Sequence, residues 1–109
     1  MPKRFSTYKE FWPYYLGEHS NPVCRLLHYG GTTLALVILV VFLVTKSPAY
    51  IAASVLCGYG PAWIGHFFIE KNRPATFDYP FWSLISDFRM YLLWLSGNIG
   101  KELKLYSVR

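Results

Sequence analysis

The sequence predicts an all-α protein: an integral membrane helical hairpin with re-entrant or interfacial helices beside it. Two long apolar segments follow each other with only a short turn between them. A third apolar segment is interrupted by charges, and Lys and Arg residues fall at the edges of the apolar segments. The chain is 53% hydrophobic and only 16% charged, whereas soluble domains average about 25% charged residues. These features are typical of a membrane protein.

The two uninterrupted segments, residues 26–45 and 47–69, have the length of membrane spans, which need about 20 residues. Each contains one histidine and no other acidic or basic residue, and Lys46 lies in the turn between them. Residues 34–44 are apolar throughout, whereas a soluble amphipathic helix would show a polar face with a period of 3.6. We therefore expect a hairpin within a single membrane-embedded domain, residues 1–109.

The third apolar segment, residues 79–97, follows a polar loop at residues 70–78. It contains Asp87 and Arg89, and it carries aromatic residues of the kind found at membrane interfaces. If this segment crossed the membrane, the basic tail would lie outside the cytosol. The segment is therefore expected to be re-entrant or interfacial.

Charge predicts the orientation and the environment. Of the 11 Lys and Arg residues, only Lys46 lies at the hairpin tip, so the positive-inside rule places both termini in the cytosol. The net charge of +5 suits anionic lipid headgroups. The sequence has no basic stripe that would indicate a nucleic-acid partner. No apolar h-region precedes the first span, so no cleavable signal peptide is expected. Cys24 and Cys57 form no disulfide or zinc pattern.

The three histidines are predicted to meet at the cytosolic face. His28 lies 18 residues before Lys46 and His66 lies 18 residues after Pro48, so an antiparallel hairpin places them at the same depth. His19 lies nine residues before His28, in the arm that enters this interface. Imidazole is the commonest protein metal ligand, and histidines with a carboxylate suit iron, zinc or manganese. The sequence thus predicts a histidine-lined metal site.

Two acidic residues are candidates for catalysis or for the metal shell. Glu70 follows His66 at spacing i, i+4, so on a continuing helix the two share a face. Asp87 lies in the third apolar segment, where an ionisable residue is a functional candidate. Solvation or pairing with a neighbouring cation is the alternative for Glu70, and pairing with Arg89 is the alternative for Asp87.

Three residues beside the predicted metal site are candidates for substrate binding. Lys71, Asn72 and Arg73 could hold the carboxylate of a fatty acid whose tail lies in lipid, and Arg suits bidentate carboxylate binding. The alternative for the two cations is simple anchoring at the inner face of the membrane.

Two blocks of the sequence resemble a known family of small membrane proteins, with the resemblance covering roughly residues 5–106. The first block reads Phe11-Trp12-Pro13-x-Tyr15-Leu16-x-x-His19-x-Asn21-Pro22, then Arg25-x-x-His28-x-x-Gly31-Thr32. The second reads His66-x-x-x-Glu70-Lys71-Asn72-Arg73-Pro74-Ala75-Thr76-Phe77-x-Tyr79-Pro80-x-Trp82-Ser83-Leu84-x-x-Asp87-Phe88-x-Met90. This long block is specific. The family is that of the iron(II)-dependent 2-hydroxy fatty acid dioxygenases.

The resemblance implies a function and a set of ligands. It implies a reaction of fatty acid α-oxidation, in which O₂ converts a 2-hydroxy fatty acid to a fatty acid one carbon shorter. It implies Fe(II) bound by His19, His28 and His66. Glu70 matches the acid of the second block, either as an iron ligand or as a residue that orients a histidine. The chain lacks the longer segments of fungal members, so fold and metal carry over more readily than substrate.

Other functions stay open on the sequence alone. They are a zinc or manganese hydrolase acting on lipids, a haem protein with paired axial histidines, and a non-catalytic membrane scaffold. A homo-oligomer is also left open, because the sequence identifies no interface. By analogy, the compartment is a bacterial inner membrane, or the endoplasmic reticulum membrane in a eukaryote.

Overall fold

The computed structural model describes residues 5–108, which contain helices and no strand. Lys3, Arg4 and Arg109, three of the cations used to predict the orientation, lie outside the described residues. The prediction of an all-α chain is confirmed over the described range. The elements are α1 (Tyr8–Gly17), α2 (Pro22–Thr45), α3 (Ala49–Ile64), the π-helix η1 (Gly65–Glu70), the 3₁₀-helix η2 (Ala75–Phe77), α4 (Pro80–Leu95) and α5 (Ile99–Leu105).

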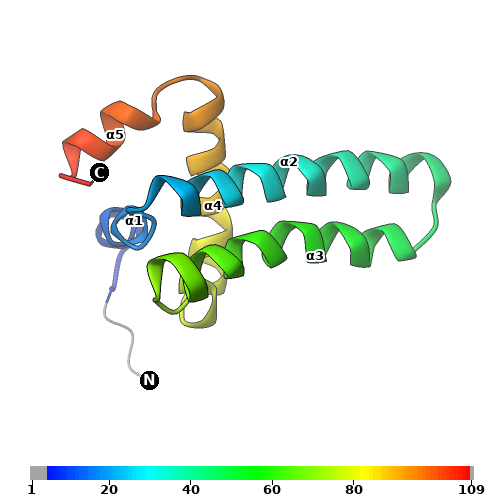
Figure 1. Cartoon of the computed structure of the whole chain (residues 1–109), viewed down its shortest axis with the longest axis horizontal. Helices are drawn as coiled ribbons and strands as arrows, with labels where there is room; N and C mark the ends of the chain where they lie inside the picture. The colour runs from blue at the N-terminus through cyan, green and yellow to red at the C-terminus, as the bar shows by residue number, and fades with distance from the viewer. Residues whose placement is uncertain (1–4, 109) are drawn as a thin grey trace.

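Helices α2 and α3 run antiparallel, side by side, and project from the rest of the chain (Figure 1). Asn21 caps α2, since its side chain accepts a hydrogen bond of 2.8 Å from the backbone N–H of Val23, and a proline follows at the first helical position. Lys46 ends α2 in the left-handed conformation, with φ 60°, and turns the chain towards α3. Across the pair, the Ser54 hydroxyl donates to the carbonyl of Ala35 at 2.8 Å.

The second apolar segment divides into two kinds of helix. Its α-helical part, α3, ends at Ile64, one turn after Pro61, and η1 continues with the wider π-helical winding. Lys71 then adopts a left-handed conformation, with φ 57°, and ends the helix. The π-helical turn carries His66, and π-helical turns occur often at functional sites.

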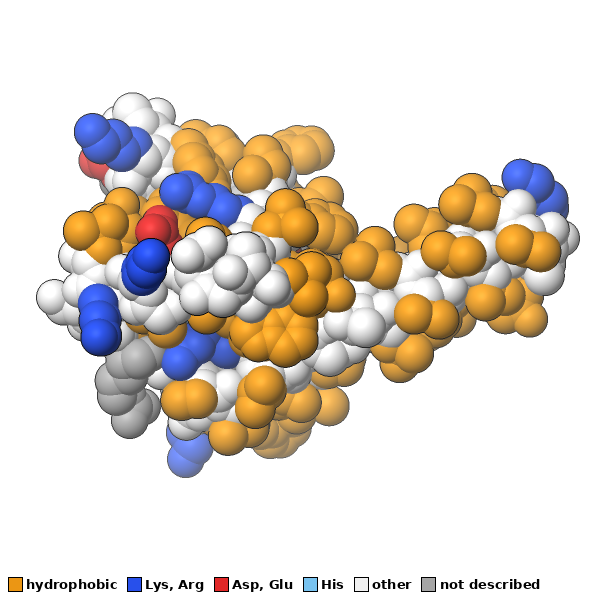
Figure 2. Space-filling model, turned by 90° about the horizontal axis from the view of Figure 1, so that it is seen from above, with side chains coloured by type: hydrophobic (Ala, Val, Ile, Leu, Met, Phe, Trp, Pro, Cys, Tyr) orange, Lys and Arg blue, Asp and Glu red, His pale blue; other side chains and the backbone are white. Residues whose placement is uncertain are grey.

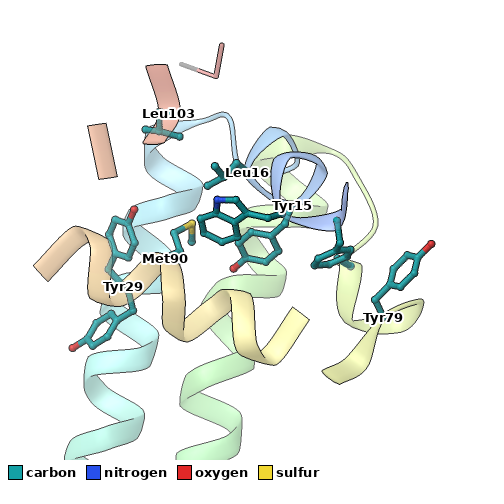
Figure 3. Packing of buried hydrophobic residues seen from close by; sticks show 10 residues of the cluster. Tyr15, Leu16, Tyr29, Tyr79, Met90 and Leu103 are labelled. Carbon is teal, nitrogen blue, oxygen red and sulfur yellow. The ribbon is translucent and has the colours of Figure 1, made fainter. Parts of the chain in front are cut away.

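Helix α4 crosses α2 and α3 near the end where η1 lies, and α1 and α5 lie beside this base (Figure 1). Trp12 of α1 donates its indole N–H to Glu102 of α5 at 3.0 Å, and Tyr8 of α1 is hydrogen-bonded to Ser86 of α4 at 2.9 Å. Figure 3 shows buried residues of this base gathered around α1, α4 and α5, among them Tyr15, Leu16, Met90 and Leu103. The core therefore lies at the base of the molecule.

The projecting part of α2 and α3, unlike the base, has apolar side chains on its surface. Figure 2 shows it covered with hydrophobic side chains, with basic side chains at its tip and over the base. Among the described residues, α2 is the one helix both long and apolar enough to cross a membrane, and most of it is not buried inside the molecule. It is therefore unlike the core helix of a soluble domain.

Candidate metal centre

Three elements bring the three histidines together at the base. His19 lies in the connection between α1 and α2, His28 lies in the second turn of α2, and His66 lies in η1. All three side chains are buried. The Nε2 atom of His19 lies 3.0 Å from that of His28 and 3.0 Å from that of His66. The predicted convergence of the three histidines is confirmed.

The other ring nitrogen of each histidine faces an oxygen that can only accept a hydrogen bond. Nδ1 of His19 lies 2.7 Å from the carbonyl of Tyr15, and Nδ1 of His28 lies 2.9 Å from that of Cys24. Nδ1 of His66 lies 2.7 Å from the side-chain oxygen of Asn72, whose NH₂ group donates to the carbonyl of Glu18 at 3.0 Å. Each Nδ1 therefore carries the proton, and in the neutral ring each Nε2 is left with a bare lone pair.

Three lone pairs directed at one another repel unless a cation lies between them. Nitrogens that share one metal ion at about 2.1 Å lie roughly 3.0–3.4 Å apart, so the observed separations of 3.0 Å suit a shared ion. Hydrogen bonds from Nδ1 to carbonyl oxygens are also the usual outer support of metal-binding histidines. The residues present therefore fit a metal ion, and all three candidate ligand atoms lie within 4.8 Å of one another.

The surroundings favour neutral imidazole at the cluster. Burial lowers the pKa of His19 well below its ordinary value, and His28 and His66 beside it lower that pKa further. An unprotonated ring is the form that binds metal. Within residues 5–108, the group of candidate ligands contains the three histidines and no carboxylate.

Two glycines allow α2 to approach α3 and η1 closely enough for the cluster to form. A Cβ atom on Gly31 would lie 2.7 Å from the carbonyl oxygen of Cys57, and one on Gly65 would lie 2.8 Å from the sulfur of Cys24. Both distances are too short for real atoms, so neither position has room for a side chain. The contact between Gly65 and Cys24 lies one residue from His66 and four residues from His28.

Polar side chains from α2 and η1 fix the connection that carries His19. The Arg25 guanidinium donates to the carbonyls of His19, at 2.7 Å, and Ser20, at 3.0 Å. The Glu70 carboxylate accepts from the backbone N–H of Asn21 at 2.5 Å and from the Ser20 hydroxyl at 3.2 Å. Glu70 thus contacts the connection and does not join the three histidines. In these contacts Glu70 binds the connection, and it does not pair with a neighbouring cation as the alternative prediction had it.

Asp87 reaches the site from α4. Its carboxylate accepts a short hydrogen bond from the hydroxyl of Tyr15, whose ring centre lies 4.2 Å from that of His19. Burial raises the pKa of Asp87 to about 7, with the Tyr15 hydrogen bond acting in the opposite direction. Arg89, the alternative partner predicted for Asp87, instead pairs with Glu102 at 3.6 Å. Asp87 also lines a small pocket together with all three histidines.

The predicted substrate-binding residues lie in different surroundings. Both polar atoms of the Asn72 amide are engaged, one with His66 and the other with Glu18. Lys71 is exposed. Arg73 pairs with Asp78 at 3.5 Å and lies over the ring of Phe77 at 5.1 Å. Lys71 and Arg73 are not among the residues that line the small histidine pocket.

Comparison with known proteins supplies a family. The family described as 2-hydroxy-palmitic acid dioxygenase Mpo1-like matches residues 5–99 of the chain. The chain belongs to this Mpo1-like family. The match spans both sequence blocks that carried the resemblance, and it includes all three clustered histidines. No curated protein and no solved structure matches the chain.

Two residues of this Mpo1-like site were not singled out from the sequence. Tyr15 supplies a carbonyl to His19 and a hydroxyl to Asp87, and Arg25 holds the connection that carries His19. Both belong to the first sequence block. The signal that could have found Tyr15 is its spacing of four residues before His19. For Arg25 it is the presence of a lone cation at the start of a long apolar segment.

Proposed function

We propose that the chain is an iron(II)-dependent dioxygenase that shortens 2-hydroxy fatty acids by one carbon at a membrane. The reaction would be R–CH(OH)–COOH + O₂ → R–COOH + CO₂ + H₂O. The bond between C1 and C2 breaks, C1 leaves as CO₂, and C2 becomes the new carboxyl carbon. The substrate loses four electrons, and these reduce O₂.

The observation that carries the proposal is the set of three bare Nε2 atoms within a buried pocket. Their lone pairs converge, and a chain of the Mpo1-like family needs a centre able to react with O₂. Bound iron(II) supplies the reactivity towards O₂, which side chains lack. His19, His28 and His66 hold it, while the carbonyls of Tyr15 and Cys24 and the amide of Asn72 fix the three rings.

The remaining candidate residues receive roles consistent with their contacts. Asp87 faces the pocket and, with a pKa of about 7, can hold or release a proton beside the substrate. Glu70 and Asn72 serve by positioning the histidines. Lys71 and Arg73 lie on the surface after η1, where their charges attract a carboxylate arriving from the interface.

We also propose that α2, with α3 and η1, inserts into the membrane. The apolar side chains of the projecting part of α2 and α3 are exposed, as contact with lipid requires. Lys46 at the tip can reach the headgroups of the opposite leaflet. The histidine cluster would then lie near the cytosolic headgroups. A substrate dissolved in the bilayer could reach it with its polar end foremost.

An activity assay with metal analysis tests the proposal. Detergent-purified protein, loaded anaerobically with iron(II), receives 2-hydroxypalmitate and then O₂, and the fifteen-carbon acid is measured by mass spectrometry. We expect the product from the native chain and its loss, together with the bound iron, in His28→Ala and His66→Ala. Ser86→Ala is the control, because Ser86 is equally buried but bonds to Tyr8, away from the cluster.

Two outcomes would contradict the proposal. The first is no product from any 2-hydroxy acid although iron is bound and Ser86→Ala and the native chain remain folded. The second is one zinc ion per chain with lipid hydrolysis in the absence of O₂, which would make the protein a hydrolase.

A further inference from the structure

Helices α2, α3 and α4 enclose an apolar groove with a volume of about 200 Å³. Leu36 and Leu39 of α2 form one wall, Val55 of α3 forms another, and Leu84 and Phe88 of α4 form the third. The groove runs along α2 from Thr32 to Leu39, which is about 10 Å at 1.5 Å per residue. None of these residues takes part in the histidine cluster.

The inner end of the groove meets the histidine pocket. Tyr59 and Asp87 line both spaces, and the histidine pocket also contains His28 and His66. A molecule in the groove would therefore have one end beside the proposed metal site.

The polarity of the groove changes along its length. The shared end is lined by Asp87 and Tyr59, whereas the outer end is lined by leucine and valine and by Ser54, whose hydroxyl donates to the carbonyl of Ala35. The walls at the outer end are partly exposed, so the groove opens to the surroundings of α2 and α3. This gradient matches a molecule with one polar end and one alkyl end.

Small residues form the floor of the groove. Ala35 and Gly58 lie opposite each other on α2 and α3, and a Cβ atom on Gly58 would be 3.6 Å from the Cβ of Ala35. The space above them exists because neither residue has a long side chain. An α-helix, about 10 Å across with its side chains, is too wide for a groove of this volume.

We propose that this groove binds the alkyl chain of a single-chain amphiphile whose polar end lies at the histidine cluster. The identity of that polar end, a 2-hydroxy carboxylate, rests on the proposed function. The alkyl chain lies parallel to α2 and α3 and covers Val55, Leu36 and Phe88. Contact with these apolar side chains gives affinity in proportion to the apolar surface removed from water or lipid headgroups.

Photo-crosslinking tests the groove without depending on turnover. The full chain, in detergent, receives palmitate or 2-hydroxypalmitate analogues with a diazirine at mid-chain, and mass spectrometry locates the labelled residues. We expect saturable labelling of residues that line the groove, reduced by an excess of unlabelled palmitate.

Two matched substitutions separate the groove from the general apolar surface. Val55→Trp fills the groove, whereas Val37→Trp adds the same bulk on α2 at a residue outside it; the two valines are similarly exposed, at 52% and 55%. We expect Val55→Trp to weaken labelling roughly tenfold, which corresponds to about 1.4 kcal/mol. The Val37→Trp variant should be labelled to the same extent as the native chain.

The outcomes distinguish this proposal from the proposed function. Labelling spread over Val37 and the outer helix surface, or equal labelling of the two Trp variants, would overturn the groove even if the enzyme is active. Labelling at the interface of two chains would assign the groove to self-association and overturn the proposal as well. Saturable groove labelling without any oxidation product would support the groove and contradict the dioxygenase.

Discussion

At the base, α2 packs against α4, α4 packs against α1 and α5, and many side chains there are buried. At the outer ends of α2 and α3, apolar side chains remain exposed, 59% for Val40 and 79% for Val44. The base contains aromatic pairs such as Tyr29 stacked on Trp94, with ring centres 4.5 Å apart. The buried side chains of the base thus pack against other parts of the chain, whereas the outer part of α2 and α3 leaves its apolar side chains exposed.

The largest effect should come from placing a charge on the outer part. Val40→Lys should cost about 3 kcal/mol if lipid surrounds α2, because a charge at the centre of a span is poorly solvated. The cost of the substitution is measured by the fraction of each variant that resists extraction from membranes. Leu105→Lys, at a residue of α5 that is 68% exposed, should change little. Equal and full retention of both variants would contradict a lipid environment for α2.

The next effect concerns the support of His19 at the base. Arg25→Met removes the donor that binds the carbonyls of His19 and Ser20, so we expect metal affinity to fall roughly 10- to 100-fold. Competition with a chelator measures the affinity. Arg73→Met removes the same kind of side chain from an exposed ion pair and should leave metal affinity unchanged. An unaltered affinity in Arg25→Met would show that the connection is held without it.

Adjacent glycines provide a third comparison. Gly31→Ala places a methyl group 2.7 Å from the Cys57 carbonyl, so the helices must separate at a cost of about 1–3 kcal/mol. Gly30→Ala meets no atom within 4 Å and should stabilise α2 by up to about 1 kcal/mol. Denaturant unfolding of both variants in detergent measures the difference. The same sign of change in both would contradict the close approach.

The smallest effect is a pH dependence at the base. The folded-state pKa of Asp87 is about 7, above the ordinary 3.8, so the stability gained with its proton is present below pH 4 and is lost as the pH rises through 7. The Asp87→Asn variant has no carboxyl group to titrate at this position, so it does not lose this stability as the pH rises. Between pH 6 and pH 7 its stability relative to the native chain should therefore increase by at most about 1.4 kcal/mol. A difference that stays constant with pH would contradict the raised pKa.

The sequence predicted the elements whose signals are local. Equal spacing from the turn predicted His28 and His66 at the same depth, because the rise per residue is the same along two antiparallel α-helices, and their ring centres lie 5.0 Å apart. The α-helical limits of α4 fall within two residues of the predicted segment 79–97. The clustering of His19 followed from its nearness to His28 in the chain.

The supporting contacts could not be predicted because they join residues far apart. Tyr15 and Asp87 are separated by 72 residues, and Ser20 and Glu70 by 50. The π-helical winding of η1 also changes which side chains share a face, so the i, i+4 spacing of His66 and Glu70 did not determine where Glu70 points. Such pairs depend on the packed structure and leave no periodic signal in the chain.

The contacts of α1 impose an order on assembly. Its residues precede α4 and α5 in the chain, yet Trp12 bonds to Glu102 of α5, and Tyr15 and Tyr8 bond to Asp87 and Ser86 of α4. Helix α1 can therefore make these contacts only after α4 and α5 have been synthesised. His19 lies two residues after the end of α1, so the docking of α1 on α4 and α5 also helps to hold the third imidazole beside the other two.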